Sequence, residues 1–377
     1  MKQYLVLLSV ILYSYVSYAQ PYATKILAED PVNLNYTAEL VIPDLNVPWG
    51  MAFLPDGSML ITERTGELYH FKNGMKTSVE GVPDVYVRGQ GGLMDIELHP
   101  DYPNNGWIYF SYSSPEGEGE GGNTAIMRAK LSDNMLVDKQ LLYKAVPNTK
   151  KGQHWGSRIE FDNDGYLYFS IGERGEGSYN AQDITRDGGK IYRLKDDGSI
   201  PKDNPFITVT NAKKAIFSYG HRNPQGLVKN PETGEIWEHE HGPMGGDEIN
   251  IIHKGKNYGW QVISYGLNYD GTKFTDITKK EGMEQPVFYW VPSIAPCGMI
   301  FVTSDKYPDW KGNLLVCSLK FKYLERLVIE DNKVVKREKL FGDLQGGKFR
   351  NVRQGPDGYI YFAVEGKGIY KIIPKNN

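Results

Sequence analysis

Histidine, arginine, asparagine and glycine are concentrated in a few short segments of the chain. A histidine accepts a proton near neutral pH, which suits it to act as a general base. Arginine and asparagine side chains donate hydrogen bonds to carboxylate and carbonyl oxygens, so they suit the binding of an oxygen-rich ligand. The segments are 89–92, 153–158, 219–226, 238–243, 247–250, 257–260, 319–322 and 348–350.

Two histidine patterns could carry chemistry. His154 is a candidate base, and the alternative for it is a histidine that is only hydrogen-bonded within a turn. His239 and His241 are separated by one residue, so on a strand they would face the same way and could ligate zinc. No third ligand motif accompanies this pair, and zinc therefore stays an alternative.

These segments lie between six copies of one pattern, which consists of a short apolar run, a turn that often contains Asp-Gly, and a run of alternating β-formers. Glycine tolerates the positive φ of tight turns, so each copy predicts a β-hairpin. Six hairpins in units of about 60 residues predict an all-β chain, a six-bladed β-propeller with four-stranded antiparallel blades. A two-sheet sandwich is the alternative. The copies begin at residues 49, 93, 159, 225, 299 and 353.

In a propeller, the loops of successive blades meet at one end of the central channel, so distant segments can share one pocket. Residues 219–226 read Tyr-Gly-His-Arg-Asn-Pro-Gln-Gly, and His-Gly-Pro at 241–243 is followed by Asp-Glu-Ile-Asn at 247–250. With His-Trp-Gly-Ser-Arg at 154–158, these motifs resemble the soluble sugar dehydrogenases that use pyrroloquinoline quinone, especially the aldose sugar dehydrogenases. The resemblance spans residues 40–373 and implies a six-bladed propeller.

The resemblance also implies a reaction, the oxidation of the anomeric hydroxyl of an aldose sugar to a lactone, with hydride passing to the quinone. It assigns the role of base to His154 and the stabilisation of developing negative charge to Arg222. The quinone carries three carboxylates, so its pocket needs cations and amide donors. The cofactor-binding residues that it implies are Gln90, Arg222, Asn223, Tyr269, Lys320, Lys348 and Arg350. An external electron acceptor must then reoxidise the cofactor.

Calcium is the second cofactor that the resemblance implies. One ion would use the backbone carbonyls of Gly242 and Pro243, where it would polarise the quinone, and another would use Glu248 and Tyr258. The alternative for Glu248 is an ordinary carboxylate at a strand end. The alternative for Arg222 is a salt bridge between neighbouring blades.

The chain departs from the family pattern in two places. Family members often carry an acid beside the histidine base, whereas the neighbour here is Gln153, so what orients the imidazole is left open. The family also has a basic-x-Arg pair at 348–350, and its first member here is Lys348. Lys320 and Lys322 are expected to alternate along a strand and thus to face the same way.

Two other functions fit a propeller. One is a Ca²⁺-dependent lactonase or esterase, which would place metal-bound carboxylates in the channel and would not need the cofactor cradle. The other is a non-catalytic binding propeller, because a fold alone does not give function. The set His154, Arg222 and Asn223 argues against a binder, which has no need of it.

Composition and length bound the remaining properties. The chain has 377 residues and a formal net charge of −3, which is too weak and mixed for nucleic-acid binding. Residues 1–19 resemble a signal peptide, so we expect a periplasmic or secreted protein with an N-terminal extension at 20–38 and the propeller at 39–374. No later stretch is long and apolar enough for a membrane span. Cys297 and Cys317 either pair or are buried thiols, and the protein is a monomer or a homodimer.

Overall fold

The computed structural model describes residues 26–31, 34–344 and 346–375, so the expected signal peptide lies outside the described residues. Within these ranges, helical structure is confined to three single turns. None of them is long and apolar enough to cross a membrane. The turns are α1 (Tyr102–Asn105), α2 (Ser178–Ala181) and η1 (Pro308–Trp310).

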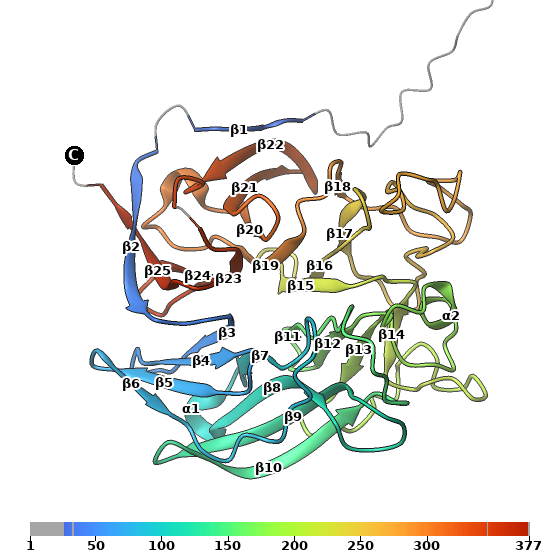
Figure 1. Cartoon of the computed structure of the whole chain (residues 1–377), viewed down its shortest axis with the longest axis horizontal. Helices are drawn as coiled ribbons and strands as arrows, with labels where there is room; N and C mark the ends of the chain where they lie inside the picture. Colours follow the sequence, from blue (N-terminus) through green and yellow to red (C-terminus); the bar gives the residue numbers. More distant parts are fainter. Residues whose placement is uncertain (1–25, 32–33, 345, 376–377) are drawn as a thin grey trace, which may run out of the picture.

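Six β-sheets, here called blades 1 to 6, surround a common centre (Figure 1). Blade 1 contains β3 (Pro48–Phe53), β4 (Met59–Glu63), β5 (Leu68–Lys72) and β6 (Met75–Ser78). Blade 2 contains β7 (Leu93–Leu98), β8 (Trp107–Ser114), β9 (Asn123–Ser132) and β10 (Met135–Lys144). Blade 3 contains β11 (Ile159–Phe161), β12 (Leu167–Ile171), β13 (Lys190–Leu194) and β14 (Ile216–Tyr219).

The second half of the chain builds the other three blades. Blade 4 contains β15 (Pro224–Lys229), β16 (Ile236–Glu240), β17 (Asp247–Ile251) and β18 (Phe288–Trp290). Blade 5 contains β19 (Pro296–Phe301), β20 (Leu314–Ser318), β21 (Tyr323–Glu330) and β22 (Lys333–Leu340), with β1 (Ala28–Glu29) added in parallel to β22. Blade 6 contains β23 (Phe349–Gln354), β24 (Ile360–Val364), β25 (Gly368–Pro374) and, at its outer edge, β2 (Tyr36–Pro43).

The first strand of each blade lies at the centre. Each of these strands contacts the first strand of the next blade, from β3 through β7, β11, β15 and β19 to β23 and back to β3. The contacts therefore close into a ring. The predicted six-bladed β-propeller with four-stranded antiparallel blades is confirmed, and the sandwich alternative is wrong.

Each of the six sequence repeats forms the first two strands of one blade. In the first repeat, Asp56 and Gly57 join β3 to β4, and in the third repeat Asp164 and Gly165 join β11 to β12. Gly57 has a φ of 82° and Gly165 a φ of 79°, which are values that side chains with a Cβ rarely adopt. The local turn chemistry thus specifies these hairpins.

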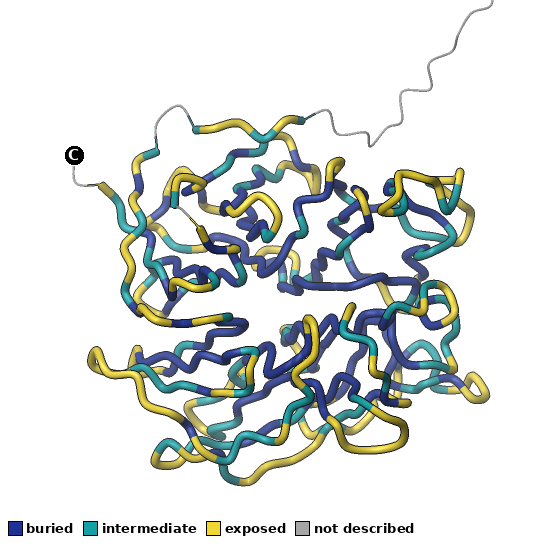
Figure 2. Tube along the Cα trace, in the orientation of Figure 1, coloured by how far each residue is buried: buried dark blue, intermediate teal, exposed yellow. Residues whose placement is uncertain are grey.

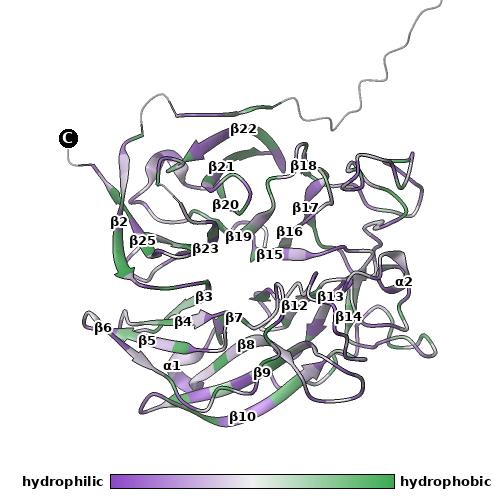
Figure 3. Ribbon diagram, in the orientation of Figure 1, coloured by the Kyte–Doolittle hydropathy of each residue, from purple (hydrophilic) through white to green (hydrophobic). Residues whose placement is uncertain are grey.

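The hydrophobic core is divided among the gaps between blades. Six buried clusters each join two neighbouring blades; the one between blades 6 and 1, for example, contains Ile42, Met51 and Tyr361. Figure 2 shows the central strands buried and the peripheral turns exposed. Figure 3 shows hydrophobic and hydrophilic stretches interleaved within the blades. Strand β4, the second strand from the centre in blade 1, is covered on both faces and is buried at every residue.

The ring is closed by pairing of the two ends of the chain. Strand β2 lies antiparallel to β25, with Tyr36 opposite Pro374 and Pro43 opposite Gly368. Strands β1 and β2 both begin within 20–38, the stretch that the sequence assigns to an N-terminal extension. This stretch therefore supplies outer strands to blades 5 and 6.

The fold settles the positions of two residue pairs, Lys320 with Lys322 and Cys297 with Cys317. Lys320 and Lys322 do not alternate along a strand, because the chain turns between β20 and β21 and Lys322 has a φ of 60°. That prediction is wrong, since it treated a turn between two strands as a continuation of β20. Cys297 and Cys317 lie opposite each other on β19 and β20 as free, buried thiols.

Candidate functional site

The candidate residues converge because of how an antiparallel blade is connected. In a four-stranded blade, the loop that enters the first strand and the loop that joins the second to the third lie at the same end. His154 precedes β11, Arg222 precedes β15, and Gly242 lies between β16 and β17. Lys320, between β20 and β21, and Lys348, before β23, occupy equivalent loops. Gln90 precedes β7 and lies in the equivalent loop of blade 2. Blades 2 to 6 thus place candidate residues at one end of the ring.

His154 is held by two contacts. Its backbone N–H donates to Oε1 of Gln90 at 2.9 Å, and its Nδ1 is bonded to the carboxylate of Glu173. Glu173 also accepts the backbone N–H of Gly177, so its carboxylate is fixed from both sides. Among the described residues, Nε2 of His154 has no hydrogen-bond partner. The ring nitrogen that remains free can accept a proton from a ligand.

Burial sets the charge of this pair. Burial lowers the pKa of His154 below its ordinary value, although the hydrogen bond that it donates to Glu173 acts in the opposite direction. Burial raises the pKa of Glu173, but the hydrogen bonds from His154 and from the backbone of Gly177, with the charge of Arg222, outweigh it and lower the pKa overall. At neutral pH the arrangement is therefore a neutral imidazole that donates from Nδ1 to a carboxylate. This is the state that a general base requires.

Arg174 fixes the loop that carries His154. Its guanidinium lies 3.4 Å from the centre of the Trp155 ring and donates to the backbone carbonyls of Gln153 and Lys151, the latter at 2.7 Å. Only 1% of Arg174 is exposed. His154 itself has a φ of 54°, which the loop must hold against the ordinary preference of a non-glycine residue.

Arg222 joins the loops of blade 4. Its Nη1 donates to the carbonyl of His241 at 3.1 Å and to that of Gly242 at 2.9 Å, while its backbone N–H is bonded to Glu240. The guanidinium lies 5.2 Å from the ring of Trp260. The expected alternative for Arg222, a salt bridge between blades, is not what the structure has, because its side chain bonds only backbone carbonyls among the described residues.

The Gly242 turn is fixed by a buried carboxylate. Asp247 accepts the backbone N–H of Gly242 at 2.8 Å and the N–H groups of Ile294 and Ala295 at 2.8 and 2.9 Å. The backbone N–H of Lys320 in turn donates to the carbonyl of Ile294 at 3.1 Å. The Gly242 loop, the loop before β19 and the Lys320 turn are therefore one connected unit.

A small cavity brings together four of the sequence-predicted residues. Arg222, Gly242, Glu248 and Tyr258 all line it, together with Trp260. Tyr258 lies on the long connection between β17 and β18, which reaches this end because the N–H of Tyr258 bonds the carbonyl of Tyr219 at 2.8 Å. Burial, and then the charge of Glu240, raise the pKa of Glu248 well above its ordinary value.

The other predicted residues are less closely tied to this cavity. Arg350 is half-buried and its guanidinium is paired with Glu365, with Nη1 3.6 Å from the thiol of Cys297. Lys320 is exposed on its turn, with Nζ 5.3 Å from the centre of the Phe321 ring. Tyr269 is 75% exposed, and Lys348 is exposed as well. In the described residues, neither the Tyr269 nor the Lys348 side chain forms a hydrogen bond, ion pair or ring contact with another candidate residue.

The zinc alternative at His239 and His241 is not supported. Nε2 of His241 bonds the carbonyl of Pro296 at 2.7 Å, and burial lowers the pKa of His241 to about 3, so its ring is neutral and Nε2 is the donor. In the part of the chain that the structure describes, the side chains grouped closely enough to hold a metal are His221, Glu238 and Glu240. Neither His239 nor His241 belongs to that group.

The site has buried donors that fit an oxygen-rich aromatic ligand. Within the described residues, Nε of Arg222, Nδ2 of Asn223 and Nε1 of Trp260 are buried without a hydrogen-bond partner. A buried donor without a partner is costly, so these atoms point to a ligand that carries acceptors. Asn223 is held by its other atom, since Oδ1 accepts the N–H of Gly156 at 3.1 Å. A quinone with carboxylates is such a ligand.

Sequence reasoning missed Glu173 and Trp260 as site residues. Glu173 follows β12 in a glycine-rich segment, Gly172 to Gly177, that could have been examined as a loop at the same end as His154. The sequence marks Trp260 only as part of the 257–260 segment. Nothing in the spacing along the chain places either side chain beside its partner.

Comparison with known proteins is consistent across sequence and structure. A sequence model of the family described as glucose/sorbosone dehydrogenase matches residues 45–371. The chain is 42% identical to the aldose sugar dehydrogenase YliI of Escherichia coli over 92% of this chain and 94% of that protein. The crystal structure of the apo aldose sugar dehydrogenase from Escherichia coli matches 90% of this chain with a TM-score of 0.86. The pyrroloquinoline quinone-bound aldose sugar dehydrogenase from Streptomyces coelicolor, 26% identical, matches 91% of this chain and 99% of its own with a TM-score of 0.73.

Proposed function

The chain belongs to the glucose/sorbosone dehydrogenase family, and from this premise we propose that it oxidises the anomeric hydroxyl of aldose sugars to lactones, with pyrroloquinoline quinone as the hydride acceptor. It is an oxidoreductase, as its relatives are. The observation that carries the proposal is the His154–Glu173 pair, whose free Nε2 lies at the same end of the ring as the unpartnered donors of Arg222 and Asn223. One relative was solved with the quinone bound, which supports this cofactor.

Each residue of the site has a separate role in the proposed reaction. Nε2 of His154 takes the proton of the sugar hydroxyl, and Glu173 stabilises the imidazolium that forms. The guanidinium of Arg222 stabilises negative charge that develops during the transfer. When bound, the quinone supplies an electrophilic carbonyl that accepts hydride. Gln90, Asn223, Lys320, Lys348 and Arg350 would hold the carboxylates and carbonyls of the quinone, with Tyr269 at the exposed rim.

Calcium is part of the proposal. The carbonyls of Gly242 and Pro243 would hold one ion, and Glu248 with Tyr258 would hold another. The charge pattern supports a cation, because Glu240 and Glu248 lie directly opposite each other on β16 and β17. Two facing carboxylates repel unless a proton or a cation lies between them. The proposed location is periplasmic or secreted, with an external electron acceptor and with a monomer or a homodimer as the assembly.

The assay that tests this function uses the purified chain with Ca²⁺, pyrroloquinoline quinone, glucose and an artificial electron-acceptor dye. Dye reduction that requires the quinone is expected. Hydrolysis of a lactone that requires metal but no quinone would instead indicate the lactonase. If neither activity is found and the quinone does not bind, the non-catalytic binding propeller becomes the better account.

Replacement of His154 by alanine tests the base. Turnover should fall by roughly 10²–10⁴-fold, the usual contribution of a positioned base, while titration with the quinone stays nearly unchanged. His253→Ala is the matched control, because His253 is exposed on the 252–287 connection. Turnover of His154→Ala within a factor of about three of the wild type would remove His154 from this role.

A further inference from the structure

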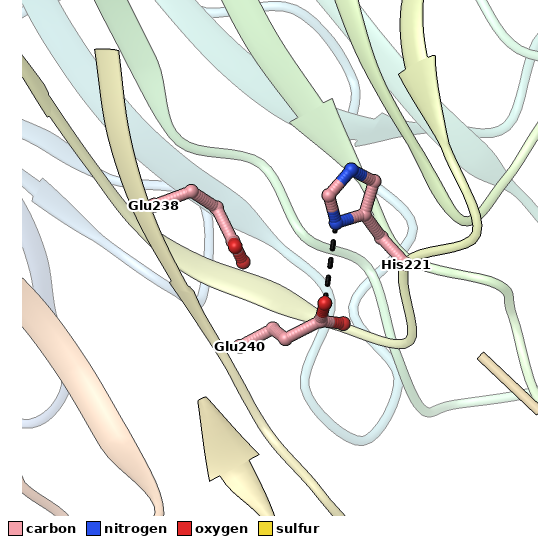
Figure 4. A group of neighbouring side chains, drawn as sticks. All are labelled: His221, Glu238 and Glu240. Carbon is pink, nitrogen blue, oxygen red and sulfur yellow. Dashed lines mark hydrogen bonds and ion pairs between the residues drawn. The ribbon is translucent and has the colours of Figure 1, made fainter. Parts of the chain in front are cut away.

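A buried group of three metal-capable side chains lies next to Arg222, whose backbone N–H is bonded to one of them, Glu240. His221 comes from the loop between β14 and β15, and Glu238 and Glu240 come from β16. One ring nitrogen or carboxylate oxygen from each lies within 4.8 Å of the others (Figure 4). All three residues are buried, and His221 and Glu238 are 0% exposed. None of the proton and hydride transfers proposed above involves these three side chains, although Glu240 also faces Glu248 at a proposed calcium position.

Each of the three side chains is held by an outer partner at its remote atom. Nε2 of His221 is bonded to Oγ of Ser218 at 2.9 Å, and Oε2 of Glu238 accepts Nδ2 of Asn250 at 3.1 Å. Oε2 of Glu240 accepts the backbone N–H of Arg222. Ligands of a bound metal are typically oriented in this way by hydrogen bonds from outside the site.

The remaining atoms of the three side chains face one another. Nδ1 of His221 is hydrogen-bonded to Oε1 of Glu240 at 3.2 Å, a contact that a bound cation would replace. Oε1 of Glu238 is buried and has no hydrogen-bond partner in the described part of the chain. An unpartnered carboxylate oxygen that is fully buried is costly, so a proton or a cation has to balance it.

From this geometry we propose that His221, Glu238 and Glu240 bind a divalent first-row transition metal, with Zn²⁺ as the representative ion. An imidazole with two carboxylates suits such an ion, whereas Ca²⁺ prefers oxygen ligands alone. The 3.2 Å between Nδ1 and Oε1 is close to the edge of about 3.4 Å in a tetrahedron with bonds of about 2.1 Å. The site differs in its ligands from the proposed calcium position at Glu248 and Tyr258 but adjoins it, because Glu240 lies opposite Glu248 and lines the same cavity.

The ion would stabilise the position of Arg222, because its ligands hold the loop that carries Arg222. Glu240 holds the backbone N–H of Arg222, and the ring of His221 stacks on Tyr258 with centroids 4.5 Å apart. A metal ligated by both residues would cross-link β16 to the loop before β15. The expected consequence is a raised melting temperature when the ion is added, with or without the quinone.

The test is a metal titration of the full-length purified chain. The protein is treated with a chelator, saturated with Ca²⁺ and titrated with Co²⁺, which reports imidazole and carboxylate ligation by visible absorption. We expect one Co²⁺ per chain that Zn²⁺ displaces and excess Ca²⁺ does not. Glu238→Gln should weaken binding at least ten-fold. Glu232→Gln, an exposed change of the same chemistry in the β15–β16 turn, should bind as the wild type does.

Two results would overturn the proposal. One is an absorption spectrum that is the same in the wild type and in Glu238→Gln. The other is displacement of Co²⁺ by Ca²⁺ at concentrations similar to those of Zn²⁺. If Glu238→Gln does not fold, as judged by circular dichroism, His221→Gln replaces it as the test variant. The readout is metal binding, so it is independent of whether the quinone-dependent activity is found.

Discussion

Glu173 supplies the acid that the sequence pattern lacks beside the candidate base. Gln153 occupies the neighbouring position along the chain, but the carboxylate that contacts Nδ1 of His154 comes from the loop after β12, 19 residues away. This contact leaves Nε2 open. A hydrogen-bonded carboxylate fixes the tautomer of an imidazole and raises its basicity.

Glu173→Gln should therefore change the pH profile as well as the rate. The acid limb of kcat/KM follows the pKa of His154, because activity is lost when the base becomes protonated. Burial already holds this pKa below its ordinary value, and Glu173 raises it, so the substitution should move the acid limb to lower pH. Turnover should fall by roughly 10²-fold or more.

Steady-state kinetics over the acid and neutral pH range check this prediction, with the exposed Glu118→Gln in the 115–122 loop as the control. A variant with lower stability but an unmoved acid limb would show that Glu173 only supports the loop.

At the scale of elements, β2 closes the ring by adding residues from the start of the chain to blade 6. The register of β2 shifts between Leu40 and Ile42, and burial changes there as well, since Ile42 is 1% exposed and Leu40 is 46% exposed. Ile42 packs in the cluster that joins blade 6 to blade 1, with Met51 and Ile61 on the other side. The strand therefore stabilises two blades at once.

Ile42→Ala should lower the free energy of unfolding by about 2–4 kcal/mol, because it leaves a cavity at the junction of the two blades. Leu40→Ala is a matched deletion on the exposed face of the same strand, and we expect it to cost less than about 1 kcal/mol. Denaturant unfolding of both variants measures the difference. Equal losses of stability in the two variants would mean that the packing of β2 between blades 6 and 1 does not stabilise the closed ring.

At the scale of the whole molecule, the side chain of Arg158 connects the blades at the centre of the ring. Its side chain contacts an element of every other blade. Nη1 bonds Asp95 of blade 2 at 2.9 Å, and Nε bonds the carbonyl of Gln225 of blade 4 at 2.7 Å. The other three contacts are with the Trp49 ring at 4.1 Å, the Cys297 thiol at 3.5 Å and the Arg350 carbonyl at 3.4 Å.

Arg158→Met should destabilise the protein by about 3–5 kcal/mol, since it leaves the buried carboxylate of Asp95 without its main partner. The exposed substitution Arg88→Met should change stability by no more than about 0.5 kcal/mol. Thermal and denaturant unfolding measure both. A loss below about 1 kcal/mol for Arg158→Met would contradict a central role for this residue.

The sequence by itself determined the hairpins, their number and the two motifs that carry the family resemblance. A hairpin depends on a turn and on residues a few positions away, so Asp56-Gly57 and its counterparts specify it locally. Regular repetition then specified the number of blades. The same local reasoning failed at Lys320 and Lys322, where no Asp-Gly marks the turn.

Only the tertiary structure decided which side chains meet. Glu173 with His154, Arg158 with all the other blades, and His221 with Glu238 and Glu240 are contacts between separate loops and strands. Their distances depend on how each blade is rotated about the axis and on which loops share an end. That arrangement follows from packing between blades, which spacing along the chain does not encode.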